Sequence, residues 1–319
     1  METQTQAALF VGHGDPMMAL RNDDVARALH SIGERIHASA PKAILAISAH
    51  WFTRGTFVQS SPEPKQIYDM YGFPPELYAI AYHPSGCKEL TRRVQDLLGS
   101  DVSVDDSWGI DHGVWTPLHH MLPKADIPVV ELSVNGLRDA RYAYEIGRRL
   151  APLRKEGFLL MGSGNIVHNL RALEPDSPHG TAKATAFSAS IRDAVTAHDY
   201  ERVLSYRSLP HALWAVPTPD HFLPLPTILG ATQQEDAEVY NDLQNFGSIS
   251  MTSFAFGLQK KRGLSEARQG LPLERVCLEG ALEAKRKGEH RCQTSTYFSP
   301  WERFASMVST SSSHKKSRR

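Results

Sequence analysis

Histidines are the main candidates for metal binding and proton transfer in this chain, because 15 of its 319 residues are histidines. A neutral imidazole binds Fe(II) or Zn(II), and it also exchanges protons near neutral pH. Four histidines follow apolar runs or lie in a proline-rich loop: His13, His50, His168 and His221. An all-histidine set that leaves metal positions open favours a catalytic site, because structural zinc sites are closed and usually rich in cysteine.

Short segments lead from apolar runs to the first three of these histidines. His13 lies in Gly-His-Gly-Asp-Pro, His50 in Ser-Ala-His-Trp, and His168 follows Gly-Ser-Gly. The preceding apolar runs are residues 7–11, 43–48 and 158–161. If these runs are strands of one sheet, their histidines converge on one edge of it. His221, in Pro-Thr-Pro-Asp-His-Phe, is then the natural fourth contributor.

Each of these histidines taken alone also fits a core side chain that is hydrogen-bonded to the backbone, which is the commoner situation. Repetition of the arrangement on three runs reduces the weight of that interpretation. The chain contains no His-Glu-x-x-His segment, so a zincin-type hydrolase finds no support in the sequence.

A fifth histidine, His112, lies in a glycine-flanked loop between tryptophans. Its imidazole suits hydrogen-bond donation or proton transfer, and Asp111 would orient it only if the loop brings the two side chains together. The alternative is that His112 is a loop histidine that caps a helix, which explains the same pattern. His119 and His120 lie on the helix expected after Trp115, where we assign them packing or supporting roles.

The loop of residues 68–78 concentrates tyrosine, phenylalanine and proline without strand or helix periodicity. We expect an ordered lid or pocket wall that stacks on an aromatic substrate, with Tyr71 and Trp115 as substrate contacts. The alternative is a packed crossover loop.

Alternation of apolar runs with helical patterns sets the expected architecture. Two more runs, 128–133 and 250–256, join the three above as predicted strands. Apolar residues recur at helical spacing in residues 23–39, 87–98, 138–150 and 182–198. This order predicts an α/β fold, a single domain with a mostly parallel central sheet flanked by helices, whose site lies where strands end.

Charge divides the chain into two parts. The 35 Lys+Arg and 35 Asp+Glu cancel, but 14 and 6 of them respectively fall in residues 259–319, which leaves 21 and 29 in residues 1–258. We therefore predict a catalytic domain over 1–258 and a basic, partly disordered appendage over 259–319, as a solvated tail or as a nucleic-acid or targeting segment. The acidic body argues against general nucleic-acid binding.

Cysteine usage and hydropathy bear on the location of the protein. The cysteines are Cys87, Cys277 and Cys292, an odd number without a Cys-x-x-Cys pair, which favours a reducing cytoplasm over a disulfide framework. The apolar run 7–11 is too short for a signal peptide or a membrane span, so no membrane association is expected.

Six of these segments, taken in order, resemble the class III extradiol ring-cleavage dioxygenases, especially the DOPA 4,5-dioxygenase branch. They are the segments around His13, His50, Tyr71, His112, His168 and His221, and the similarity runs over about residues 7–258. Each motif alone is weak, but six in sequence are a specific signal. Residues after 258 have no counterpart in this resemblance.

The resemblance implies roles for the histidines. His13, His50 and His221 match the metal ligands, and His168 matches the acid/base beside the metal, which also contacts a bound zinc. His112 matches a second pocket histidine with substrate contact or proton transfer. Some class III relatives have glutamate as the third ligand, so His221 at that position favours the DOPA branch.

The implied reaction is cleavage of a catechol (DOPA-like) ring by O₂ at Fe(II), with Zn(II) able to occupy the same ligands. Zinc does not supply electron transfer to O₂, so a zinc-filled protein should be inactive in this reaction. A zinc-dependent hydrolase, in which the same histidines activate a water, is the second hypothesis. A non-catalytic binding module is the third, and five pocket histidines argue against it.

Overall fold

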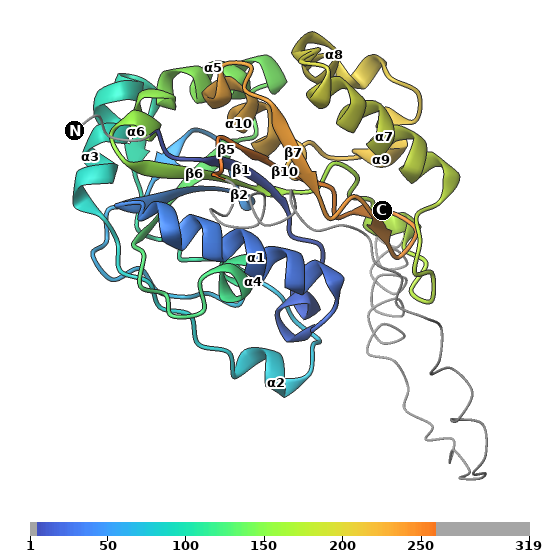
Figure 1. The fold of residues 1–319 in the computed structure, drawn as a ribbon, viewed down its shortest axis with the longest axis horizontal. Coiled ribbons are helices and arrows are strands. Elements are labelled where there is room, and N and C mark those ends of the chain that lie inside the picture. The colour runs from blue at the N-terminus through green and yellow to red at the C-terminus, as the bar shows by residue number, and fades with distance from the viewer. Residues whose placement is uncertain (1–4, 260–319) are drawn as a thin grey trace, which may run out of the picture. The chain divides into compact units, whose positions relative to one another are not determined.

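An eight-stranded sheet forms the centre of the protein in a computed structural model, which describes residues 5–259 (Figure 1). The strand order is β4-β3-β5-β2-β6-β1-β10-β7. The four central strands are parallel: β5 (Val129–Asn135), β2 (Ala43–Thr53), β6 (Phe158–Gly164) and β1 (Ala8–Gly12). Residues 260–319 of the predicted appendage lie outside the described residues, and the predicted domain boundary stays a prediction.

Shorter strands complete the two edges of the sheet. On one side, β10 (Ser253–Phe256) pairs antiparallel with β1, and β7 (Ala237–Tyr240) pairs antiparallel with β10. On the other side, β3 (Phe57–Val58) pairs antiparallel with β5 and parallel with β4 (Ser103–Val104). A separate hairpin consists of β8 (Gln244–Asn245) and β9 (Ile249–Ser250).

Alternate residues of the central strands bury into two different helical layers, as the period of two in a strand requires. Leu9 and Val11 belong to a core shared with α1 (Asp24–Ser39) and α4 (His112–Met121). Ala8 and Phe10 belong to the opposite core, whose helices are α3 (Lys88–Leu98), α5 (Ala140–Leu150), α7 (Ala182–Thr196) and α10 (Pro224–Thr232). Figure 1 shows α1 and α4 on one face of the sheet and α5 and α10 on the other. The sheet is therefore covered on both faces, which confirms the predicted fold class.

Capping side chains explain where the predicted helices begin. Asp23, Asp139 and Thr181 each accept a hydrogen bond from a backbone N–H in the first turn of α1, α5 and α7. Short helices fill the connections: α2 (Pro75–Tyr78), α6 (Pro152–Lys155), α8 (Tyr200–Leu204), α9 (Ala212–Ala215), and 3₁₀ turns at Pro16–Leu20, Gly99–Asp101, Leu170–Ala172 and Tyr206–Ser208. Within residues 5–259, no helix has both the length and the apolar character needed to cross a membrane.

Strand β2 differs from the prediction in a way that matters for the site. The sequence predicts that it ends at residue 48, but the strand continues to Thr53. Its pairing with β5 is interrupted by an irregularity between Ser48 and Phe52, and its pairing with β6 ends at Ser48. His50 lies in this interruption, so its side chain is released from the sheet although the strand itself goes on.

Candidate metal and catalytic site

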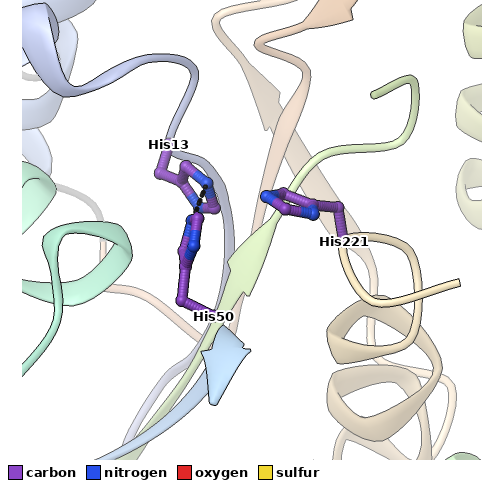
Figure 2. A group of neighbouring side chains, drawn as sticks. All are labelled: His13, His50 and His221. Atoms are coloured by element: carbon purple, nitrogen blue, oxygen red, sulfur yellow. Dashed lines mark hydrogen bonds between the residues drawn. The ribbon is translucent and has the colours of Figure 1, made fainter. Parts of the chain in front are cut away.

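Three histidines from distant parts of the chain converge at the carboxyl edge of the parallel strands (Figure 2). His13 follows β1, His50 lies in the β2 irregularity, and His221 precedes α10. Their ring centroids are 5.0, 5.2 and 4.9 Å apart, which is nearly an equilateral triangle. Three imidazoles on one metal ion at a bond length of about 2.1 Å have centroids about 4.5–5.2 Å apart, so the spacing fits a shared ion.

The hydrogen bond to Ser163 determines which nitrogen of His13 faces the centre. Nδ1 of His13 lies 2.9 Å from Oγ of Ser163, and that hydroxyl donates its proton to the carbonyl of Gly113. Because a hydroxyl has only one proton, Ser163 must accept from His13. Nδ1 of His13 therefore carries the hydrogen, and its Nε2 presents a lone pair to the centre.

His221 has the same orientation through a different partner. Its Nδ1 lies 2.6 Å from Oδ2 of Asp220, a carboxylate that accepts the ring hydrogen. Its Nε2 is buried and has no hydrogen-bond partner. A buried ring nitrogen without a partner is costly, and a metal ion is one way of satisfying it.

The third histidine brings its nitrogen against that of the first. Nε2 of His50 lies 3.1 Å from Nε2 of His13, the contact drawn as a dashed line in Figure 2. Two nitrogens bound to one ion are about 2.9–3.4 Å apart, so this distance also fits a metal. With Nδ1 of His13 protonated, the two facing nitrogens are satisfied either by a hydrogen that Nε2 of His50 donates or by a metal ion bound to both.

The electrostatics favour the neutral form of two of these rings, those of His13 and His50. Burial lowers the pKa of His13 and His50 well below the usual value, and repulsion from the neighbouring histidines lowers both further. Neutral imidazoles are the form that binds Fe(II) or Zn(II). The three side chains thus fit a metal ion by spacing, His13 and His221 also by lone-pair direction, and His13 and His50 by protonation state.

His168 lies against the triangle rather than within it. Its ring stacks on that of His221 at a centroid distance of 3.5 Å and an interplanar angle of 8°. Burial and the neighbouring His221 lower its pKa well below the usual value, although Asp220 opposes this. His168 remains partly exposed, so a neutral base lies beside the three histidines.

His112 is on the other side of the site, at the start of α4. Its ring centroid lies 3.9 Å from that of His50. Its Nδ1 is 3.0 Å from Oδ2 of Asp69, whose other oxygen accepts the His112 backbone N–H at 2.9 Å. Asp111, considered from the sequence as the orienting carboxylate, instead accepts from Ser48 and from the indole of Trp108. The neighbour of the His112 ring is therefore Asp69, which sequence reasoning missed.

Two buried carboxyl groups, those of Asp111 and Glu131, lie at the loop that precedes His112. Burial raises the pKa of Asp111 to about 6, and repulsion from Asp69 adds to the increase. Burial also raises the pKa of Glu131 well above its usual value, with Asp111 contributing. One oxygen of Glu131 accepts the backbone N–H of Asp111, so these acids hold the loop before α4 from within the core.

The two predicted substrate contacts occupy different environments. Tyr71 is 67% exposed at the tip of the 68–78 loop. Trp115 is fully buried, packs against Tyr68 and donates its indole N–H to the carbonyl of Ile67. Trp115 thus supports the loop through its contacts with Ile67 and Tyr68. Direct contact of Tyr71 or Trp115 with the substrate stays a prediction.

Glycines let the histidine-bearing segments approach one another. A Cβ on Gly164, at the end of β6, would lie 2.2 Å from the carbonyl oxygen of His221. A Cβ on Gly113 would lie 2.7 Å from the His50 ring. Both distances are shorter than real Cβ contacts, so these positions require glycine to bring His221 and His50 to the centre.

Comparison with known proteins agrees with this geometry. Residues 7–257 match the family described as the catalytic LigB subunit of aromatic ring-opening dioxygenase. The chain is 38% identical to the 4,5-DOPA dioxygenase extradiol of Escherichia coli K12, over 81% of this chain and 97% of that protein, and 38% identical to that of Beta vulgaris, over 80% and 98%. A crystal structure of an uncharacterized E. coli K12 protein superposes with a TM-score of 0.69 at 34% identity, covering 79% of this chain and 99% of that one.

Proposed function

Because the chain belongs to the family of the catalytic LigB subunit of aromatic ring-opening dioxygenases, we propose that it opens the ring of a DOPA-like catechol with O₂ at a metal ion held by His13, His50 and His221. The observation that carries the assignment of ligands is the convergence of three imidazoles, of which two direct Nε2 inward through defined partners. Family membership favours this reaction over a zinc-dependent hydrolase.

The proposed catalytic metal is Fe(II), and Zn(II) fits the same nitrogens. Bound Fe(II) supplies open positions for both catechol oxygens and O₂ together with redox chemistry, whereas zinc supplies positions only. An all-nitrogen set of ligands suits either ion, so the choice of metal determines whether the same site is active.

The role proposed for His168 is to move protons. A catechol must lose a hydroxyl proton before its ring is opened, and a neutral imidazole beside the site accepts it. The parallel stack on His221 keeps the His168 ring adjacent to the bound substrate, and its low pKa keeps it unprotonated until a proton arrives. The protonated ring then returns the proton to the oxygenated product.

The substrate is proposed to lie between this histidine pair and the 68–78 loop. Relatives named 4,5-DOPA dioxygenase extradiol support a DOPA-like catechol as the substrate class. His112 closes the opposite side of the site, where it contacts the substrate or exchanges a second proton. The proposed role of the exposed Tyr71 is to cover an aromatic ring of the substrate, which its position at the loop tip supports, and Trp115 fixes the loop through its hydrogen bond to Ile67.

The cytoplasm remains the proposed location, on the grounds of cysteine usage alone. Cys87, the cysteine within the described residues, is a free thiol. A mononuclear Fe(II) enzyme also requires a reducing environment, because its ferrous ion must be retained.

Reconstitution of the apoprotein with Fe(II) under anaerobic conditions tests the proposal. We expect O₂ uptake and a ring-opened product, identified by mass spectrometry, on addition of DOPA and air, and neither with the zinc-loaded protein. The matched control is His119→Ala, because His119 lies on α4 outside the triangle of ligands. The absence of catechol-dependent O₂ uptake from protein with full iron occupancy would refute the function, and ester turnover by the zinc form would restore the hydrolase.

A further inference from the structure

The carboxylate of Asp69 connects the metal site to the second pocket histidine. Its Oδ2 lies 3.0 Å from Nδ1 of His112 and 3.4 Å from Nδ1 of His50. Its Oδ1 accepts the backbone N–H of His112 at 2.9 Å. One nearly buried side chain, with 12% of its area exposed, therefore touches a proposed metal ligand and a proposed proton-transfer group at once.

The backbone around Asp69 is fixed independently of these histidines. The N–H of Ile67 donates to the carbonyl of Ile110, and the carbonyl of Ile67 accepts the Trp115 indole. The hydroxyl of Tyr68 donates to the carbonyl of Ile80. Asp69 is thus held at its position by the anchored loop and by the backbone N–H of His112.

These are close contacts rather than aligned hydrogen bonds, since Nδ1 of His112 has no hydrogen-bond partner, so Asp69 acts on both rings through its negative charge. A carboxylate only accepts hydrogen bonds, so a ring nitrogen facing it is stabilised when it carries the hydrogen. Each ring then has its hydrogen on Nδ1 and its lone pair on Nε2. For His50 this is the state that binds metal, and for His112 it is the state that accepts a proton from a ligand in the pocket.

We propose that Asp69 is a positioning residue that holds both His50 and His112 in the Nδ1–H tautomer, which makes His112 a second proton acceptor facing the substrate. The role assigned to His112 and the effect on metal affinity rest on the proposed function, whereas the tautomers do not. Among the described residues, Asp69 thus links the aromatic loop to the metal site by direct contact.

Replacement of Asp69 by asparagine gives a sharp test. The amide of the Asp69→Asn variant has one acceptor and one donor group, and the fixed backbone N–H of His112 requires the acceptor. The NH₂ group would then face the rings, so it would donate to Nδ1 of His112 and force the hydrogen onto Nε2. It would also oppose the Nδ1–H of His50. We expect Asp69→Asn to invert the His112 tautomer and to weaken zinc binding about 10- to 100-fold.

The measurements are ¹⁵N NMR of histidine-labelled, zinc-loaded protein and zinc affinity by competition with a chromophoric chelator. The matched control is Glu76→Gln, which removes one negative charge from an exposed position of the same loop and should leave both values unchanged. His112 with its hydrogen on Nε2 in the wild-type protein would overturn the proposal without any variant. So would an Asp69→Asn protein with unchanged tautomers, whatever its affinity, because Asp69 would then have a purely structural role. Neither measurement needs turnover, so failure of catechol cleavage alone leaves the proposal standing.

Discussion

Ser163 offers a test of how strongly the surroundings of a ligand control metal binding. Its Oγ is fully buried, accepts from Nδ1 of His13 and donates to the carbonyl of Gly113. Ser163→Ala leaves both groups without a partner in a buried site, and each such loss costs about 1–3 kcal/mol. His13 also becomes free to move its hydrogen to Nε2, the nitrogen needed by the metal.

We expect two separable effects from Ser163→Ala. The free energy of unfolding of the apoprotein falls by about 1–3 kcal/mol, from the unpaired groups. Zinc affinity falls about 10- to 100-fold, since loss of a partner that orients a metal-binding histidine has this typical effect. The second effect corresponds to about 1.4–2.7 kcal/mol of binding free energy.

Ser133→Ala separates the two effects, because Ser133 is also buried and also makes two hydrogen bonds. Its Oγ accepts from the hydroxyl of Thr53 and from the backbone N–H of Phe57. Both variants should lose stability in urea unfolding of the apoprotein, but only Ser163→Ala should lose zinc affinity in a chelator competition. Equal affinities for the two variants would refute the argument that Ser163 orients His13.

Four further outcomes are expected. Alanine in place of any one proposed ligand, His13, His50 or His221, should remove most bound metal while the fold remains. Elemental analysis would measure the metal, and circular dichroism would measure the fold. His168→Gln should lower turnover about 10²- to 10⁴-fold with iron retained, and lost iron would instead make His168 a ligand. Gly164→Ala should lower both zinc affinity and melting temperature, because its Cβ would collide with the His221 carbonyl. Truncation after Gln259 should leave a folded, metal-binding protein, and unfolding on truncation would contradict the predicted boundary.

Local patterns were sufficient to predict the parts of the site that follow buried strands. The runs before His13 and His168 are apolar because β1 and β6 are covered by helices on both faces, so the end of each run shows directly in the sequence. The edge strands β3 and β4 are two residues each and carry no such pattern. They exist because neighbouring strands offer unpaired backbone groups, which no local pattern encodes.

The orienting partners were harder to predict for the same reason. Asp220 is next to His221 in the chain, so the sequence contained a signal for that pair. Asp69 meets His112 across 43 residues, and Ser163 meets His13 across 150. Such pairings depend on strand register and on how the loops are anchored. A polar residue in or near an aromatic loop can have many other roles, so its presence in the sequence does not identify its partner.

The site therefore combines ligands that local patterns reveal with partners that only the fold reveals. His13, His50 and His221 have three different Nδ1 neighbours, a hydroxyl, a carboxylate on a loop and a carboxylate in the adjacent position. All three neighbours lie at the nitrogen that points away from the centre, so each favours a lone pair directed inward. Three inward lone pairs repel one another unless a cation lies between them. We therefore expect a cation between the three rings to stabilise this arrangement, which supports the proposed metal site.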